Sequence, residues 1–167
     1  MLAESIFQIT LMLATLLTTL VTGFILIFAI VIMPGIGSLN NLDFLRAFQV
    51  IDRVIQNNQP LFIFIWIGSA LSLIIATILG IGQLEGIARI LIVVATLSFI
   101  FGTQLPTIRV NIPLNNRVQA LNIDTLDEAS QIAERQHFES RWNRWNVIRT
   151  IFASLTSVLL IIVVRLI

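Results

Sequence analysis

Apolar residues dominate four long stretches of the 167-residue chain, and polar residues gather in two segments between them. A helix needs about 20 predominantly apolar residues to cross the roughly 30 Å of hydrocarbon in a bilayer. The four stretches reach or approach this length and cover residues 6–33, 60–81, 87–105 and 147–167. The pattern predicts an all-α fold, a four-transmembrane-helix bundle forming one multi-pass integral-membrane domain over residues 1–167, in contact with membrane lipids.

Prolines mark the ends of these predicted spans. Pro34 is predicted to end the first span and Pro106 the third, because proline lacks the N–H that continues a helix. Pro60 suits the first position of a helix and is predicted to begin the second span. The two polar segments, residues 38–59 and 107–146, each connect an odd span to an even one. Both segments should therefore lie on the same side of the membrane.

The polar segments contain predicted structure of their own. Residues 42–57 have the periodicity of an amphipathic helix. Thr125 and Glu128 form a capping box, and neither proline nor glycine follows them. An extramembrane helix over residues 126–146 is therefore predicted to continue into the fourth span. Residues 107–116 are rich in asparagine and proline, which predicts a shaped loop at the membrane boundary.

Composition and charge exclude several classes of protein. Only 11% of the residues are charged, against about 25% in a soluble domain. The net charge of +1 provides no basic field to gather phosphates, so we expect no nucleic-acid partner. The absence of cysteine excludes disulfides and thiol catalysis. The single histidine, His137, follows Glu134 at the Glu-x-x-His spacing of di-iron proteins, but no second such pair exists, so we expect no metal site.

Arginines alone set the predicted orientation, because the chain has no lysine. The side of the membrane with the polar segments holds eight arginines and the other side two. By the positive-inside rule, both polar connections are predicted to be cytoplasmic, with the N- and C-termini on the opposite side. The eight are Arg46, Arg53, Arg109, Arg117, Arg135, Arg141, Arg144 and Arg149, and the two are Arg89 and Arg165.

Polar residues from three parts of the chain are predicted to meet at the membrane boundary. Steps of about 100° per residue place Gln49, Asp52 and Gln56 on one face of the short amphipathic helix. The predicted loop contributes Arg109, Asn111 and Asn115. One stripe of the long helix carries Gln131, Arg135, Phe138, Trp142, Trp145, Asn146 and Arg149. We expect these segments to form the mouth of a pocket. Since no charged residue lies at the centre of a span, a pump or ion channel is disfavoured.

Two motifs are shared with a known family. They are Asn-x-Pro-Leu-Asn at residues 111–115 and Arg-Trp-x-x-Trp-Asn-x-x-Arg at residues 141–149. Further shared residues are Met33 and Pro34, then Gln49, Ile51 and Asp52, then Pro60 and Phe62. On these residues, most of the chain resembles the anthrone oxygenase-like family of small four-helix membrane proteins from bacteria and fungi. The chain departs from the family at Asp52, where asparagine is more often expected.

The resemblance implies that a lipophilic phenolic or polycyclic (anthrone-type) substrate, a hydrophobic aromatic small molecule, is oxidised by O₂ with no metal, flavin or other cofactor. A deprotonated electron-rich substrate can itself reduce O₂, so the protein need supply only a base, groups that hold the anion and a dry aromatic slot. On this interpretation Asp52 is the catalytic base, and Arg109 and Arg149 stabilise the anion. The expected substrate-binding residues are Gln49, Asn111, Asn115, Asn146 and the stacking tryptophans Trp142 and Trp145.

Other interpretations of the same residues stay open. Arg149 could snorkel to the headgroups or pair with Asp52. Trp142 and Trp145 occupy positions typical of an interfacial aromatic belt, and Asn111 and Asn115 could be turn and cap residues only. Two other functions also fit the sequence: a noncatalytic small membrane subunit that docks on a larger complex, and a quinone- or lipid-binding protein. The sequence does not decide whether the chain forms a homo-oligomer.

Overall fold

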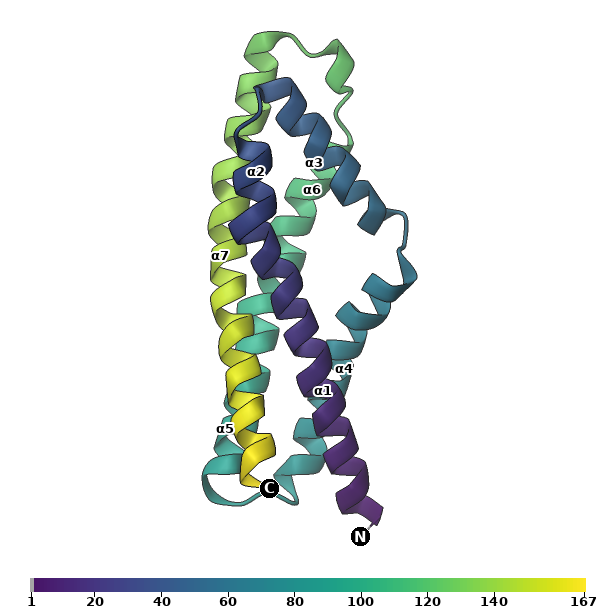
Figure 1. Ribbon diagram of the computed structural model, residues 1–167, viewed down its shortest axis with the longest axis vertical. Helices are drawn as coiled ribbons and strands as arrows, with labels where there is room; N and C mark the ends of the chain where they lie inside the picture. Colours follow the sequence, from purple (N-terminus) through teal and green to yellow (C-terminus); the bar gives the residue numbers. More distant parts are fainter. Residues whose placement is uncertain (1) are drawn as a thin grey trace.

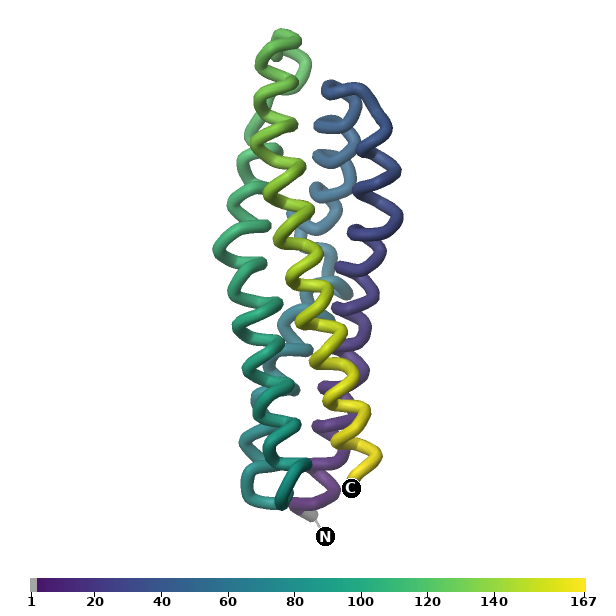
Figure 2. Tube along the Cα trace, turned by 90° about the vertical axis from the view of Figure 1, so that its left-hand side faces the viewer, coloured from purple at the N-terminus to yellow at the C-terminus, as the bar shows by residue number. Residues whose placement is uncertain are grey.

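Helices make up nearly the whole molecule, and most of them run along its long axis (Figure 1, Figure 2). The computed structural model describes residues 2–167 and contains no strand in that range, so the all-α prediction is confirmed. In chain order the elements are α1 (Leu2–Ile27), the π-helical segment η1 (Phe28–Ile32), α2 (Met33–Gly37), α3 (Asn41–Gln56), α4 (Pro60–Ile81), α5 (Gly86–Leu97), the π-helical segments η2 (Ser98–Gln104) and η3 (Thr107–Asn111), α6 (Ile112–Gln119), the 3₁₀ turn η4 (Ile123–Thr125) and α7 (Glu128–Leu166).

Four continuous helical stretches are long and apolar enough to cross a membrane, which confirms the predicted number of spans within residues 2–167. They are Ala3–Gly37, Pro60–Ile81, Gly86–Gln119 and Glu128–Leu166. Both termini lie at one end of the molecule (Figure 1). The opposite end carries α3 and the connection between α6 and α7, so the two polar connections lie together.

Two predicted helix ends are wrong, because prolines inside the first and third helices do not stop them. Pro34, Pro106 and Pro113 each lie two residues beyond the end of a π-helical segment. A proline cannot donate to the carbonyl four residues earlier, and its ring crowds that carbonyl. A π-helical turn relieves both problems, since it is wider and its carbonyls bond one residue further along the chain. The helices therefore continue past all three prolines.

The predicted loop over residues 107–116 is also wrong, since η3 and α6 occupy it and the third helix runs unbroken from Gly86 to Gln119. The only departure from a regular α-helix in this segment is η3, which is π-helical. Extra residues in each π turn change the direction in which the following side chains point. This change of direction brings Thr107 and Asn111 to the buried side of the helix.

The helices at the polar end begin at side-chain caps. Asn40 accepts a hydrogen bond from the Asp43 backbone N–H at 2.9 Å at the start of α3, which follows the predicted helix over residues 42–57 closely. Asp127 caps α7 by accepting from the Ser130 N–H at 2.8 Å, so the predicted capping box starting at Thr125 is wrong. As predicted, α7 is a single helix. Its 39 residues span about 58 Å, well beyond a bilayer's hydrocarbon core.

Two buried clusters of apolar side chains hold the bundle together. The first joins α1, α4, α5 and α7 near the end with the termini, where its central residues include Leu11, Leu73, Ile92 and Leu160. The second lies at the polar end and joins η1 and α3 to the third helix and α7. Its members are Phe28, Met33, Phe44, Leu45, Phe48, Val110, Leu114, Val118, Ile123, Phe138 and Trp142. This second cluster fixes α3 against α7 and so positions the polar residues described below.

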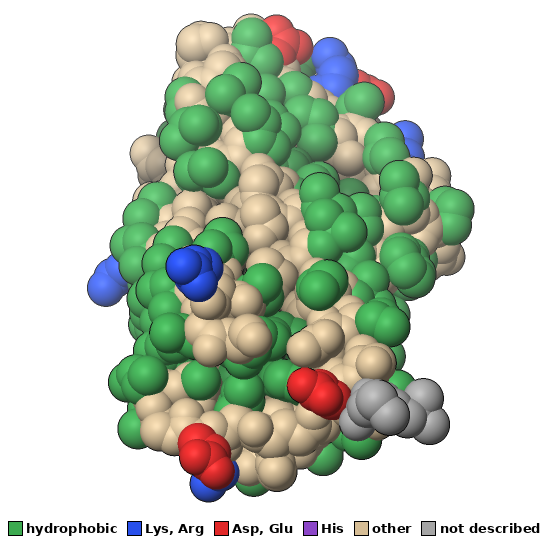
Figure 3. Space-filling model, turned by 60° about the horizontal axis from the view of Figure 1, so that its bottom comes forward, with side chains coloured by type: hydrophobic (Ala, Val, Ile, Leu, Met, Phe, Trp, Pro, Cys, Tyr) green, Lys and Arg blue, Asp and Glu red, His purple; other side chains and the backbone are tan. Residues whose placement is uncertain are grey.

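The outer surface of the spans is apolar. Large hydrophobic side chains are exposed on all four, for example Ile9 (66%), Ile78 (65%), Ile90 (58%) and Ile161 (54%). Charged side chains are few and scattered on the face toward the termini (Figure 3). In water such a surface would aggregate, whereas in a bilayer it contacts lipid tails. The structure therefore describes an integral membrane protein.

A close approach between the third helix and α7 depends on Gly102. A Cβ atom added at Gly102 would overlap the Phe152 side chain, whereas one added at Gly23 in α1 would meet nothing within 4 Å. We expect Gly102→Ala to destabilise the fold by about 1–3 kcal/mol through overpacking. Gly23→Ala should be neutral or slightly stabilising, because alanine is the better helix former. Thermal unfolding in detergent measures both, and equal melting temperatures for the two variants would contradict this packing.

Candidate functional site

A cavity lies between α1, α3, α4, the third helix and α7, in the half of the bundle that carries α3. Its volume is about 160 Å³. One ordered water needs roughly 10–15 Å³, so the cavity has room for an organic group. Asp52 and Arg149 are the only charged residues in its lining. The lining consists of Phe24, Ile25, Phe28, Phe48, Asp52, Ile55, Phe62, Trp66, Thr107, Asn111, Ile112, Asn115, Trp142, Asn146 and Arg149.

Three side-chain amides surround the Asp52 carboxylate, which is only 3% exposed. Asn115 donates to Oδ1 at 2.8 Å, and Gln119 and Gln56 donate to Oδ2 at 3.0 and 3.1 Å. Burial raises the pKa of the Asp52 carboxyl above its ordinary value, and the three amide donors act in the opposite direction without cancelling that rise. A carboxylate with a raised pKa accepts a proton more readily than a solvated one.

The Arg149 guanidinium lies in the lining without a counter-ion. The residue is 4% exposed, and no acidic group in residues 2–167 forms an ion pair with it. Its Nη1 donates to Thr107 Oγ1 at 3.0 Å and its Nη2 to Asn146 Oδ1 at 2.6 Å, while its buried Nε has no partner. The alternative that Arg149 pairs with Asp52 is therefore wrong. A buried cation without an anion is costly, so this position suits an anionic ligand.

Asn115 and Asn111 connect the tryptophan of α7 to the polar groups of the cavity. The Trp142 indole N–H donates to Asn115 Oδ1 at 2.7 Å, and Asn115 in turn donates to Asp52. Asn111 donates from Nδ2 to the Trp142 carbonyl at 3.4 Å, and its buried Oδ1 has no donor. Arg149 Nε and Asn111 Oδ1 thus have no partner within residues 2–167, and both atoms are buried beneath the surface of the cavity. Both residues line the cavity, so its polar side carries hydrogen-bonding capacity that the protein itself does not use.

Aromatic rings form most of the apolar wall. The rings of Phe28 and Phe48 lie 5.7 and 5.8 Å from the Trp142 ring. On the α4 side, Phe62 stacks on Trp66 at 5.5 Å with an interplanar angle of 23°. The Arg149 guanidinium carbon lies 5.6 Å from the centre of the Trp142 ring. Such a wall favours a flat aromatic ligand and keeps water away from the two charges.

The sequence profile described as anthrone oxygenase matches residues 48–159 of this chain. The chain belongs to the anthrone oxygenase family. The match includes every lining residue of the cavity except Phe24, Ile25 and Phe28. No curated protein and no solved structure matches the chain.

Six of the nine residues predicted from the sequence as site residues line the cavity of this anthrone oxygenase family member, and three do not. The six are Asp52, Asn111, Asn115, Trp142, Asn146 and Arg149. They come from α3, the third helix and α7, so three distant parts of the sequence meet around one enclosed space, as expected. Their roles in binding or catalysis stay predictions.

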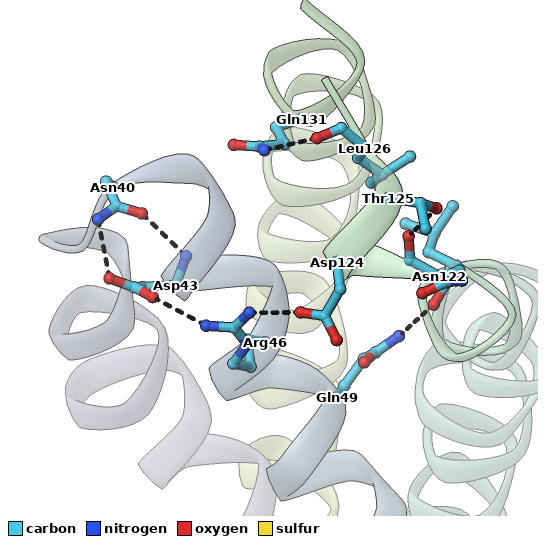
Figure 4. A network of polar contacts seen from close by, with 10 residues as sticks. Asn40, Asp43, Arg46, Gln49, Asn122, Asp124, Thr125, Leu126 and Gln131 are labelled. Atoms are coloured by element: carbon cyan, nitrogen blue, oxygen red, sulfur yellow. Dashed lines mark hydrogen bonds and ion pairs between the residues drawn. The ribbon is translucent and has the colours of Figure 1, made fainter. Parts of the chain in front are cut away.

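Gln49 lies outside the cavity and instead holds α3 against the end of α6. Its Nε2 donates to the Val118 carbonyl at 2.7 Å and to the Leu121 carbonyl at 3.0 Å. Nearby, Arg46 forms an ion pair with Asp124 at 2.6 Å, so that α3 faces the connection between α6 and α7 (Figure 4). Since Asp52 lies one turn after Gln49 on α3, these contacts fix the position of the carboxylate.

Arg109 and Trp145 also lie outside the cavity. Arg109 is exposed, and it has no hydrogen-bond or ion-pair partner in residues 2–167. Trp145 lines a separate apolar groove on the outer surface of the bundle. The direction of Arg109 follows from η3, which turns Thr107 and Asn111 inward and leaves Arg109 outward. Of the two tryptophans, only Trp142 lines the cavity. Trp145, on the next turn of α7, lies on the outer side of the contact between α7 and the third helix.

Sequence reasoning gave no site role to the residues that hold the two charged side chains in place. Gln56 and Gln119 bind Asp52, and Thr107 binds Arg149. Gln56 has a detectable signal, since it follows Asp52 by one helical turn and lies on the same face. Gln119 and Thr107 have none, because their directions depend on the π-helical segments before them. The phenylalanines of the wall have the same spacing as ordinary core residues.

Glu134 and His137, whose side-chain types commonly bind metals, do not line the cavity. No group of three or more His, Cys, Asp and Glu side chains comes together within residues 2–167. Both carboxylate oxygens of Glu134 accept from Arg117, at 2.8 Å each. His137, three residues later, is exposed. The Glu-x-x-His pair is thus part of the surface of α7.

Proposed function

We propose that this protein is a membrane enzyme that oxidises a lipophilic phenolic or polycyclic substrate of the anthrone type with O₂, without a bound cofactor. Membership of the anthrone oxygenase family supports the class of reaction. The composition of the cavity supports the chemistry, because it combines a buried carboxylate, an unpaired guanidinium and an aromatic wall. The two charges are the observation that carries the proposal. They face one space without forming an ion pair, so a ligand can lie between them.

Deprotonation of the substrate is the first step of the proposed reaction. The Asp52 carboxylate takes a proton from an activated C–H or phenolic O–H of the bound molecule. The negative charge that develops on the substrate oxygen is held by the guanidinium of Arg149, which lines the cavity without a counter-ion, and the Asn111 amide orients the bound molecule. Asn115 and Asn146 fix the two charged groups by hydrogen bonds. The resulting anion is electron-rich and far easier to oxidise than the neutral substrate.

The anion then supplies the electrons that reduce O₂. For a methylene carbon flanked by two aromatic rings, the carbon loses two hydrogens and gains one oxygen atom to become a carbonyl. The second oxygen atom leaves as water, which carries away both hydrogens. The protein holds the substrate and returns the proton taken by Asp52. A dry, apolar cavity protects the anion from protonation by solvent before O₂ reaches it.

Oxygen uptake by the purified protein tests this proposal. Protein in lipid nanodiscs, mixed with a hydroxylated anthrone, should consume one O₂ per molecule of quinone formed, at a rate well above that of the substrate in empty nanodiscs. A metal chelator should not change the rate. If the protein consumes no O₂ above the empty-nanodisc rate with any anthrone-type compound, the proposed reaction is contradicted.

The quinone- or lipid-binding function predicted as an alternative would use the same cavity without turnover. It predicts saturable binding of a flat aromatic molecule with no oxygen uptake, so the same measurement separates the two. The alternative of a noncatalytic docking subunit has less support, because the polar residues converge on an enclosed space rather than covering an outer face. Association with a second copy or with a larger complex stays a prediction.

A further inference from the structure

A second hollow, far more open to the surroundings, runs along the outer surface between the third helix and α7. Its volume is about 460 Å³. Leu97, Phe101 and Pro106 line it from one helix, and Trp145, Ile148 and Phe152 from the other. All six lie on helices long and apolar enough to cross a membrane, so the groove is placed to contact lipid. Its apolar lining suits a hydrocarbon chain.

The floor of this groove is built before any ligand arrives. The Ser98 hydroxyl donates to the Phe152 carbonyl at 3.2 Å, which ties the two helices together. Gly102 lets the Phe152 side chain approach the backbone of the third helix more closely than any other residue would allow. The hydrogen bond and the close contact at Gly102 therefore hold the two helices together along the groove.

Two arginines continue the groove toward the polar end of the molecule. On the third helix, Arg109 is exposed and follows the lining residue Pro106 by three positions. On α7, Arg141 precedes Trp145 by four residues and Ile148 by seven, so it belongs to the same stripe. Both arginines are exposed, and neither has a hydrogen-bond or ion-pair partner in residues 2–167. Two helices thus each bring one uncompensated cation to the same end of an apolar groove.

We infer that this groove binds an anionic phospholipid, with one acyl chain along the apolar lining and the phosphate between Arg109 and Arg141. The charge complementarity selects the headgroup, because basic pockets between transmembrane helices are typical sites for anionic lipids. Trp145 lies between the arginines and the apolar part, which is the depth at which indoles contact the boundary of headgroups and tails. The site is independent of the reaction in the cavity, since none of its residues lines that cavity.

Native mass spectrometry of the purified protein with phosphatidylglycerol tests the site, with phosphatidylcholine as the neutral control. We expect one phosphatidylglycerol to bind preferentially. Its affinity should fall about fivefold in Arg109→Ala or Arg141→Ala and about thirtyfold in the double variant. Arg53→Ala is the matched control, because Arg53 is exposed at the same end of the molecule and also has no partner in residues 2–167. Its affinity should be that of the wild type.

A groove-filling variant tests the acyl-chain part separately. Ile148→Trp places bulk in the groove and leaves both arginines, so phosphatidylglycerol should be lost while the helical content stays unchanged. The inference is overturned if phosphatidylcholine binds as well as phosphatidylglycerol, if the double variant keeps its lipid, or if Arg53→Ala loses lipid equally. Lipid binding that survives Ile148→Trp would also overturn the inference. The same holds if the wild-type protein is a dimer and Ile148→Trp breaks the dimer without changing lipid binding, because the groove would then be a contact between two copies of the chain.

Discussion

Replacing Arg149 by methionine should lower kcat/KM for an anthrone-type substrate by about 10²–10³-fold. This is the loss typical when one preorganised donor to a developing oxyanion is removed. Methionine keeps most of the side-chain volume, so the aromatic wall around Trp142 should stay in place. Arg149→Lys should recover part of the activity, because it keeps the charge but cannot reproduce the planar set of guanidinium donors.

The control for this variant is Arg53→Met. Arg53 lies beside Asp52 in the sequence, but its side chain is exposed and does not line the cavity. Its kinetics should equal those of the wild type. Steady-state oxygen uptake in nanodiscs, with circular dichroism to verify folding, provides the comparison. Full activity in a folded Arg149→Met protein would remove Arg149 from the reaction and leave it a structural role at the membrane boundary.

The second large effect is expected at Asp52, where substitution by asparagine should lower kcat about 10²–10⁴-fold, the usual contribution of a general base. Asparagine keeps the shape of the side chain but cannot take the proton. It also presents an amide to three donors that now bind a carboxylate. Asp43→Asn, a change at a half-exposed position on the same helix, should leave kcat unchanged.

The pH dependence carries the signature that distinguishes a base from a structural carboxylate. Burial raises the pKa of Asp52 above 3.8, so the protonated, inactive form persists to a higher pH than for a solvated aspartate. Wild-type kcat/KM should therefore be full at high pH and fall as the pH decreases through that raised pKa. The residual activity of Asp52→Asn should lack this limb. A folded Asp52→Asn protein with wild-type kcat and the same pH profile would rule out proton transfer to Asp52.

The spans and the short helix could be predicted from the sequence because hydrophobic periodicity is a local property. Residues 60–81 were predicted as the second span, and α4 has the same bounds. The site was predictable to the extent that it lies on regular helix: Asp52 on α3, and Trp142, Asn146 and Arg149 on α7, point where steps of about 100° place them. The two large polar segments also meet at one end, which follows because each of them connects an odd span to the even span after it.

The third helix could not be predicted in the same way. Its prolines indicate helix ends, whereas π-helical turns carry the chain past Pro106 and Pro113. Each π-helical turn contains more residues than an α-helical turn, which changes the direction in which all later side chains point. The direction of Arg109 therefore depends on backbone hydrogen bonds that no sequence pattern reveals. For the same reason Thr107 was not recognised as a partner of Arg149. Trp142 and Trp145 both fit the predicted stripe, and only packing against α3 and η1 decides between them.

Anaerobic binding of a hydroxylated anthrone isolates deprotonation by Asp52 in the cavity from the later reaction with O₂. The neutral compound and its anion have different absorption spectra. In the absence of O₂ at neutral pH, we expect wild-type protein to bind the compound as the anion and Asp52→Asn to bind it in the neutral form. If the compound stays neutral when bound to the wild-type protein, Asp52 is not the base that deprotonates the substrate.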